Sequence, residues 1–84
     1  MTKKYYTAKI KDYRAEMSDR DVVVTAKITY KDPDSDNIHE VYTAASATCH
    51  PNDIFDFATG VALATLRLEK RVNDLVFRLN EALY

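Results

Sequence analysis

One short acidic loop in this 84-residue chain carries three carboxylates at alternate positions. Asp32, Asp34 and Asp36 alternate as the first ligands of a calcium-binding loop do, where carboxylate oxygens coordinate the ion. Such a loop needs glycine at its sixth position and a bidentate glutamate at its twelfth, but Asn37 and Thr43 stand there. Carboxylates are also ordinary turn formers between strands. The sequence therefore predicts a solvated turn and no metal site.

Cys49 and His50 are the residue types of a nucleophile and its base. Both fall at the end of a predicted strand, where adjacent side chains point to opposite faces and cannot pair unless the strand has already ended. Cys49 is therefore expected to be a small buried thiol beneath the helix. His39 starts the same strand, about 35 Å from His50, which is too far to share a metal ion. The chain has no phosphate-binding loop, nucleophile elbow or zinc-ligand spacing. We predict a non-enzymatic protein without a cofactor; an active site assembled between subunits is the one catalytic alternative.

Three segments show the two-residue periodicity of half-buried strands. They cover residues 5–17, 22–31 and 38–49. The second segment is the most regular, and its apolar face consists of Val22, Val24, Ala26, Ile28 and Tyr30.

The last third of the chain has the periodicity of a long helix, from Asn52 to Leu83. Pro51 suits the first turn, Asn52 or Asp53 can cap it, and Asp53 with Asp56 complements the positive end of the helix dipole. The stripe expected to face the core consists of Ile54, Phe57, Ala58, Val61, Thr65, Leu68, Val72, Leu75, Leu79 and Leu83.

Gly60 is the only glycine, and it leaves two arrangements open. It either divides a short first helix from a main one, or stays helical and lets another backbone approach closely. We favour a continuous or slightly bent helix. The resulting prediction is an α+β fold in a single domain over residues 1–84, in which a three-stranded antiparallel sheet is covered on one face by a long C-terminal helix (βββα).

Several large apolar residues fall on the helix side that points away from the predicted core. Phe55, Leu66 and Phe77 are eleven residues apart, three turns each, and form a line about 33 Å long. Such a line is typical of an interface, and a second subunit would extend a small core. We therefore predict a homo-oligomer (a dimer or higher), or a docked partner protein, on Phe55, Leu63, Leu66, Phe77 and Tyr84.

The other face of the predicted sheet collects basic and aromatic residues. Such a face can stack bases and contact phosphates, although lysine and threonine are also ordinary on solvent-facing strands. The net charge of −1 argues against nucleic acid as the main partner. Binding of nucleic acid or nucleotide is therefore the second interpretation, through Tyr5, Lys9, Lys11, Tyr13, Lys27, Lys31 and Tyr42.

Composition and hydropathy favour a globular domain without membrane association. Hydrophobic residues make up 46% of the chain and charged residues 30%, and no apolar stretch is long enough to span a bilayer. The single Cys49 fits a reducing compartment, and no signal peptide is visible. We expect a cytoplasmic protein.

The segment over residues 47–67 resembles a pattern in small proteins of phages and their bacterial hosts. In that pattern a strand ending in Ala-x-Cys is followed by Pro-x-Asp-x-Phe-Asp, then Gly, then a Leu-Ala-x-x-Arg helix. Here these positions are Ala47 and Cys49, Pro51 to Asp56, Gly60, and Leu63 to Arg67. The group has no settled activity. The resemblance implies a compact accessory protein in the host cytoplasm that blocks a host factor, such as a component of antiviral immunity, by occupying a surface or sequestering a ligand.

The order of elements also looks like a double-stranded-RNA-binding domain that lacks its first helix. The basic loop and the basic helix start used in that family are absent, because the helix here begins with Asp53 and Asp56. This second resemblance therefore adds little to the nucleic-acid interpretation.

Overall fold

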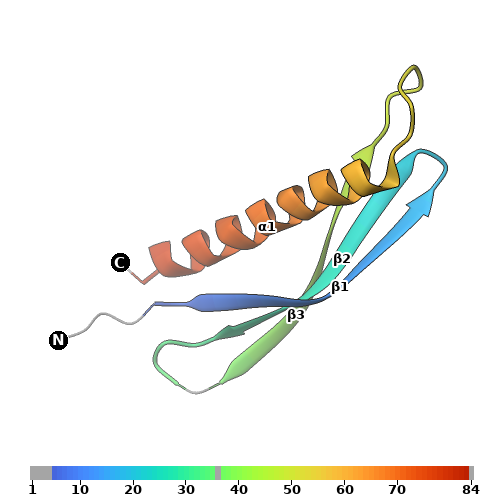
Figure 1. The fold of residues 1–84 in the computed structure, drawn as a ribbon. Coiled ribbons are helices and arrows are strands. Elements are labelled where there is room, and N and C mark those ends of the chain that lie inside the picture. The colour runs from blue at the N-terminus through green and yellow to red at the C-terminus, as the bar shows by residue number, and fades with distance from the viewer. Residues whose placement is uncertain (1–4, 36, 84) are drawn as a thin grey trace.

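A narrow antiparallel sheet and one long helix make up the fold. The computed structural model describes residues 5–35 and 37–83. The strands are β1 (Thr7–Ser18), β2 (Asp21–Lys31) and β3 (Ile38–Thr48), with β2 in the centre. The helix α1 (Phe57–Glu81) lies across one face of this sheet (Figure 1). The predicted α+β fold with βββα order is confirmed.

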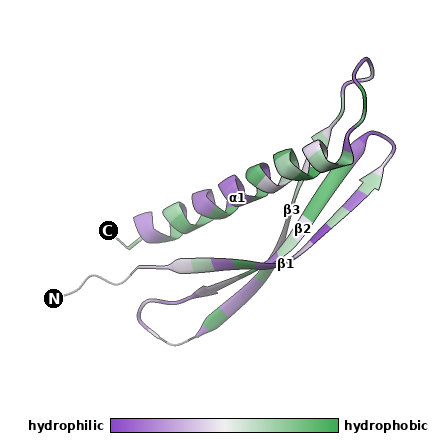
Figure 2. Ribbon diagram, viewed as in Figure 1, coloured by the Kyte–Doolittle hydropathy of each residue, from purple (hydrophilic) through white to green (hydrophobic). Residues whose placement is uncertain are grey.

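The core lies between β2 and the first two thirds of α1. Alternate residues of β2 are buried, and their partners on the helix recur at four-residue spacing, so each element turns one apolar face inward. Figure 2 shows this apolar character along β2 where it runs beside the helix. Burying one side chain of the size of leucine stabilises the fold by about 1.5–3 kcal/mol. The buried residues are Val22, Val24, Ala26, Ile28, Ala45, Ala47, Ala64, Leu68 and Val72.

Gly60 lies inside α1, and the helix continues through it. A Cβ atom built at this position would come within 2.6 Å of Cγ2 of Val22, which is closer than real Cβ atoms approach. Gly60 therefore allows the helix backbone to rest directly on β2. This confirms the continuous helix and rules out a division at Gly60; the close approach is to the Val22 side chain and not to another backbone.

The predicted helix start at Asn52 is wrong, because α1 begins at Phe57. Arg20, in the turn between β1 and β2, holds the segment in front of the helix in a non-helical conformation. Its Nη2 donates to the carbonyl oxygen of Asp53, which would accept from the backbone N–H of Phe57 if the helix already included both residues. The same Nη2 donates to the carbonyl oxygen of His50 at 3.0 Å, and that oxygen also accepts from the N–H of Asp53 at 2.9 Å. Residues 50–53 therefore form a separate turn in front of the helix.

The N-cap of α1 is Asp56, and the predicted caps Asn52 and Asp53 lie outside the helix. One carboxylate oxygen of Asp56 accepts from the backbone N–H of Ala58 at 3.1 Å, and the other accepts from the hydroxyl of Thr59 at 2.6 Å. The hydroxyl of Thr59 lowers the pKa of Asp56, and the backbone N–H groups act in the same direction.

The late start of α1 exchanges the predicted environments of two neighbouring residues. Ile54 was expected in the core stripe but is 95% exposed, whereas Phe55 was expected on the outer line but is half-buried and packs against the core. Both residues precede the helix, so the helical phase used to place them does not apply. Phe55 is therefore removed from the predicted interface.

The two ends of the predicted core stripe also differ from the structure. Phe57, Ala58 and Leu83 were expected to face the core but are exposed, while Ala64 is fully buried without having been predicted. Phe57 and Ala58 form the first turn of α1, and Leu83 lies beyond the end of the helix at Glu81. The sheet covers the middle of the helix better than its ends, so the stripe is shorter than the periodicity suggested.

Helix side chains cover part of β3, which is an edge strand. Arg67 donates to the carbonyl oxygen of Ser46 at 2.8 Å, and Arg71 donates to that of Ala44 at 2.5 Å. An edge strand presents alternate carbonyl groups that no neighbouring strand can use. The two arginines thereby occupy acceptors that could otherwise pair with a foreign strand.

The other end of α1 is tied to the start of β1 by one amide side chain. Asn80 accepts from the backbone N–H of Tyr6 at 2.6 Å and donates to its carbonyl oxygen at 3.2 Å. Its amide therefore pairs with Tyr6 as a residue of a neighbouring strand would. In the part of the chain that the structure describes, no helix is both long and apolar enough to cross a membrane.

Candidate interaction surfaces

The solvent face of α1 is the clearest exposed apolar feature of the helix. Leu66 is 63% exposed and Phe77 is 69% exposed, and Leu63 beside them is 44% exposed. At 100° per residue these three lie on the side opposite the buried stripe of the helix. Because that stripe packs on the sheet, the opposite side of α1 faces solvent along its length (Figure 1). The buried stripe consists of Ala64, Leu68 and Val72.

Three of the five residues predicted for this interface are exposed on α1: Leu63, Leu66 and Phe77. Phe55 packs against the core instead, and Tyr84 lies outside the described residues. The predicted line is therefore shorter at both ends. We define the α1 outer face by the exposed apolar residues Leu63, Leu66 and Phe77, together with the exposed polar residues Lys70 and Asp74 between them.

The second predicted surface, the outer face of the sheet, carries shallow hollows. One hollow of about 780 Å³ is lined by Arg14, Thr25 and Tyr42, among others, and another of about 460 Å³ is lined by Lys9, Lys11 and neighbouring side chains. Tyr42 is 79% exposed, so its ring is accessible for stacking. Two residues predicted for this face do not contribute as expected. Tyr13 points to the opposite side of the sheet, and the charge of Lys27 is paired with Glu40.

Tyr13 does not belong to the outer sheet face. The pairing of β1 with β2 is regular up to Lys11 and resumes with Arg14 opposite Thr25, so the strand carries a bulge between them. Asp12, in the bulge, has a φ of 58°. The extra residue reverses the alternation, which turns Tyr13 to the helix side, where burial and then the charge of Glu69 raise the pKa of its hydroxyl.

Lys27 is on the outer sheet face, but its charge is already paired. Its Nζ lies 3.1 Å from a carboxylate oxygen of Glu40 on β3. The hydrogen bond to Glu40 raises the pKa of Lys27, which keeps the side chain protonated and engaged within the sheet. Glu40 therefore reduces the positive potential that a phosphate group would meet on this face.

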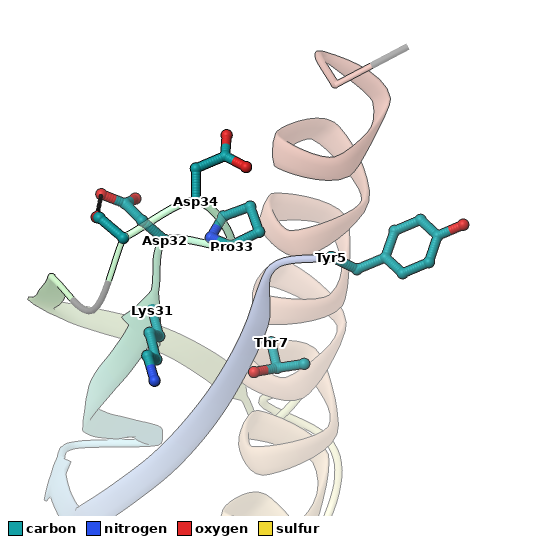
Figure 3. A pocket seen from close by; sticks show the side chains of 7 residues that line it. Tyr5, Thr7, Lys31, Asp32, Pro33 and Asp34 are labelled. Carbon is teal, nitrogen blue, oxygen red and sulfur yellow. Dashed lines mark hydrogen bonds between the residues drawn. The ribbon is translucent and has the colours of Figure 1, made fainter. Parts of the chain in front are cut away.

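The acidic loop forms an open hollow of about 470 Å³ at the far end of the sheet. In Figure 3 the carboxylates of Asp32 and Asp34 point in different directions, and the Tyr5 side chain extends away from both. Asp32 is occupied within the chain, since it accepts from the Ser35 hydroxyl at 3.4 Å and lies 3.1 Å from Nε2 of His39. Within residues 5–35 and 37–83, no group of three or more His, Cys, Asp or Glu residues could hold a metal ion.

The side chains of Cys49 and His50 contact different partners. Both residues follow Thr48, the last residue of β3, so the alternation used to separate them does not apply there. The thiol of Cys49 lies 3.2 Å from Nη2 of Arg20, whereas the His50 ring accepts from the backbone N–H of Asn52 at 3.2 Å. Cys49 is half-buried, less than the buried thiol expected from the sequence. A hollow of about 350 Å³ adjoins it, lined also by Ile54, Gly60 and Leu63.

Arg20 is the structurally important residue that the sequence analysis missed. It holds Cys49 and two backbone carbonyls of the connection between β3 and α1. Its own carbonyl accepts from the backbone N–H of Cys49 at 2.8 Å. An arginine in a hairpin turn normally extends into water, so the sequence contained no local signal for this role.

Comparisons of the chain with models of known protein families, with curated proteins and with solved structures gave no significant match.

Proposed function

We propose that this chain is a non-catalytic interaction protein whose binding surface is the α1 outer face. The observation that carries the proposal is the exposure of Leu66 and Phe77 on the side of α1 opposite the core. Contact of these large apolar side chains with water is unfavourable, and a partner that covers them removes that cost. Burial of apolar surface, at about 25 cal/mol per Å², would then favour association.

The test uses Leu66→Asp and Phe77→Asp, because a buried carboxylate opposes docking at this face. Neither side chain contributes to the core of its own chain, so both variants should keep the circular-dichroism spectrum of the original fold. We expect each to lower the mass in solution, or to abolish capture of a partner protein from lysate. Ile38→Asp is the matched control, because Ile38 is 66% exposed but lies on β3. Unchanged mass and unchanged capture in both α1 variants would refute the proposal.

The resemblance of residues 47–67 to small phage proteins suggests the setting of such an interaction. In that setting the partner would be a host protein, such as a component of antiviral immunity, whose surface this chain occupies. The proposal for the α1 outer face does not depend on this setting. Capture experiments with lysate of a bacterial host would identify such a partner directly.

A second candidate function is binding of nucleic acid or nucleotide by the outer sheet face, and the exposed ring of Tyr42 favours it. The pairing of Lys27 with Glu40 weakens it. Binding should decrease steeply as salt rises and should fall in Tyr42→Ala. A mobility-shift assay at low salt that shows no complex would exclude this candidate.

A further inference from the structure

We propose that the occupant of the α1 outer face is a second copy of this chain, whose own α1 lies antiparallel to the first about a two-fold axis. The inference rests on the proposed function and names the partner of the same face. Each sheet covers the opposite side of its helix, so the two sheets would lie on the outside and the two helices in the middle.

The spacing of the two most exposed apolar residues of the helix is self-complementary. Leu66 and Phe77 are separated by eleven residues, so they project from nearly the same side of α1, about 16.5 Å apart along its axis. A two-fold axis placed midway between them, and perpendicular to both helices, brings Leu66 of each copy against Phe77 of the other. One apolar contact is then made twice, as an isologous interface requires.

The charges between these residues select the antiparallel direction. Lys70 and Asp74 are both exposed and lie about 2 Å and 4 Å from that axis, measured along the helix, on opposite sides of it. Lys70 of one copy would therefore lie beside Asp74 of the other, and the pair would form twice. A parallel arrangement would instead place Lys70 near Lys70 and Asp74 near Asp74, and like charges oppose association.

The side chains of Lys70 and Asp74 are available for these contacts. Neither makes a hydrogen bond or an ion pair with another residue that the structure describes. Docking would therefore break no such contact of either side chain. The attraction across the interface would be gained without a matching loss inside each copy.

The experiment is a charge exchange followed by sedimentation equilibrium over a wide range of concentrations. Lys70→Glu places a carboxylate beside Asp74 of the second copy, and Asp74→Lys places two ammonium groups together. We expect each single variant to raise the dissociation constant of the dimer by about tenfold or more, because two attractive pairs become repulsive. The double variant Lys70→Glu/Asp74→Lys should return to within about threefold of the original value, and an equimolar mixture of the two single variants should form heterodimers.

Circular dichroism melts of all variants check that the fold is intact. An original chain that stays monomeric at every concentration overturns the second-copy inference. The proposed function survives that result if Leu66→Asp still abolishes capture of another protein. A dimer whose dissociation constant is the same in all three charge variants also overturns the inference, because it uses another face or another direction.

Discussion

The two ends of the sheet are closed by different kinds of contact. At the end where α1 begins, the helix backbone at Gly60 rests on Val22, and the small side chains of Ala45 and Ala47 are buried. At the end with the loop between β2 and β3, the contacts beyond the buried Ile28 are polar or aromatic. They comprise the Asn80 amide on Tyr6, the stack of Tyr30 on His39 with ring centroids 4.8 Å apart, and the contact of His39 with Asp32.

The geometry of the elements explains this difference. A straight helix lying across a twisted sheet can follow one end closely but must diverge from part of the other. Figure 1 shows the hairpin of β2 and β3 turning away from the last turns of α1. Val41 on β3 consequently remains 37% exposed, although it pairs with the buried Ile28. The helix-start end should therefore carry most of the stability, and the hairpin end should tolerate substitution.

The largest expected effect contrasts a buried aliphatic residue in the middle of α1 with a partly exposed one near the hairpin end of β3. Leu68→Ala removes a side chain with no solvent exposure and should lower the free energy of unfolding by about 2–5 kcal/mol. Val41→Ala removes a partly exposed side chain and should lower it by less than about 1 kcal/mol. Urea unfolding followed by circular dichroism measures both. Equal losses would show that Val41 contributes as much to stability as the buried Leu68, and would contradict the weaker cover of the hairpin end.

The next effect concerns the close approach at Gly60. Gly60→Ala would normally stabilise a helix, but here the new methyl group meets Cγ2 of Val22. We expect a net loss of about 1–2 kcal/mol, since overpacking outweighs the gain in helix propensity. Ala62→Ser, at an exposed position of the same helix, is the control and should change the free energy of unfolding by less.

A double-variant cycle sharpens this prediction. Val22→Ala removes the atoms that the new methyl group would meet, so Gly60→Ala should cost less in that background than in the original chain. Additive losses in the same unfolding experiment would mean that Gly60 and Val22 do not interact.

A smaller effect is expected at the hairpin end. Asn80→Ala deprives the backbone of Tyr6 of both hydrogen bonds and should lower the free energy of unfolding by about 1 kcal/mol. The start of β1 should then exchange its amide hydrogens faster, while β2 stays protected. Asn52→Ala removes an exposed amide in the turn before the helix and should change neither measurement. Equal protection of Tyr6 in the two variants would contradict this role of Asn80.

The smallest effect is a pH dependence at the helix start. The folded state holds the pKa of Asp56 below its usual value, so the contribution of this cap is complete above the unfolded pKa of about 3.9. It is lost as the pH falls through the lower folded pKa, where the carboxylate takes up a proton. Asp56→Asn keeps an acceptor oxygen that does not titrate, so the stability difference between the two chains should narrow in acid. A difference that is constant over this range would exclude titration of the cap.

Periodicity alone predicted the order of elements and the buried face of β2. Val22, Val24, Ala26 and Ile28 alternate without interruption, and Leu68 and Val72 repeat at helical spacing. Such patterns reflect local geometry, since side chains alternate in a strand and recur every three to four residues in a helix. The exposure of Leu63, Leu66 and Phe77 on α1 follows from the same rule and was predicted correctly.

Other features were decided by contacts between segments far apart in the chain. Arg20 holds a separate turn in front of the helix, and with the later helix start Phe55 packs on the core and Ile54 stays in solvent. The bulge in β1 arises from its register with β2, and it turns Tyr13 to the helix side. Periodicity assumes that an element is regular and that its ends are known. A single long-range hydrogen bond can move the first residue of a helix, and an extra residue in one strand can exchange the faces of the residues after it. Only the tertiary structure contains that information.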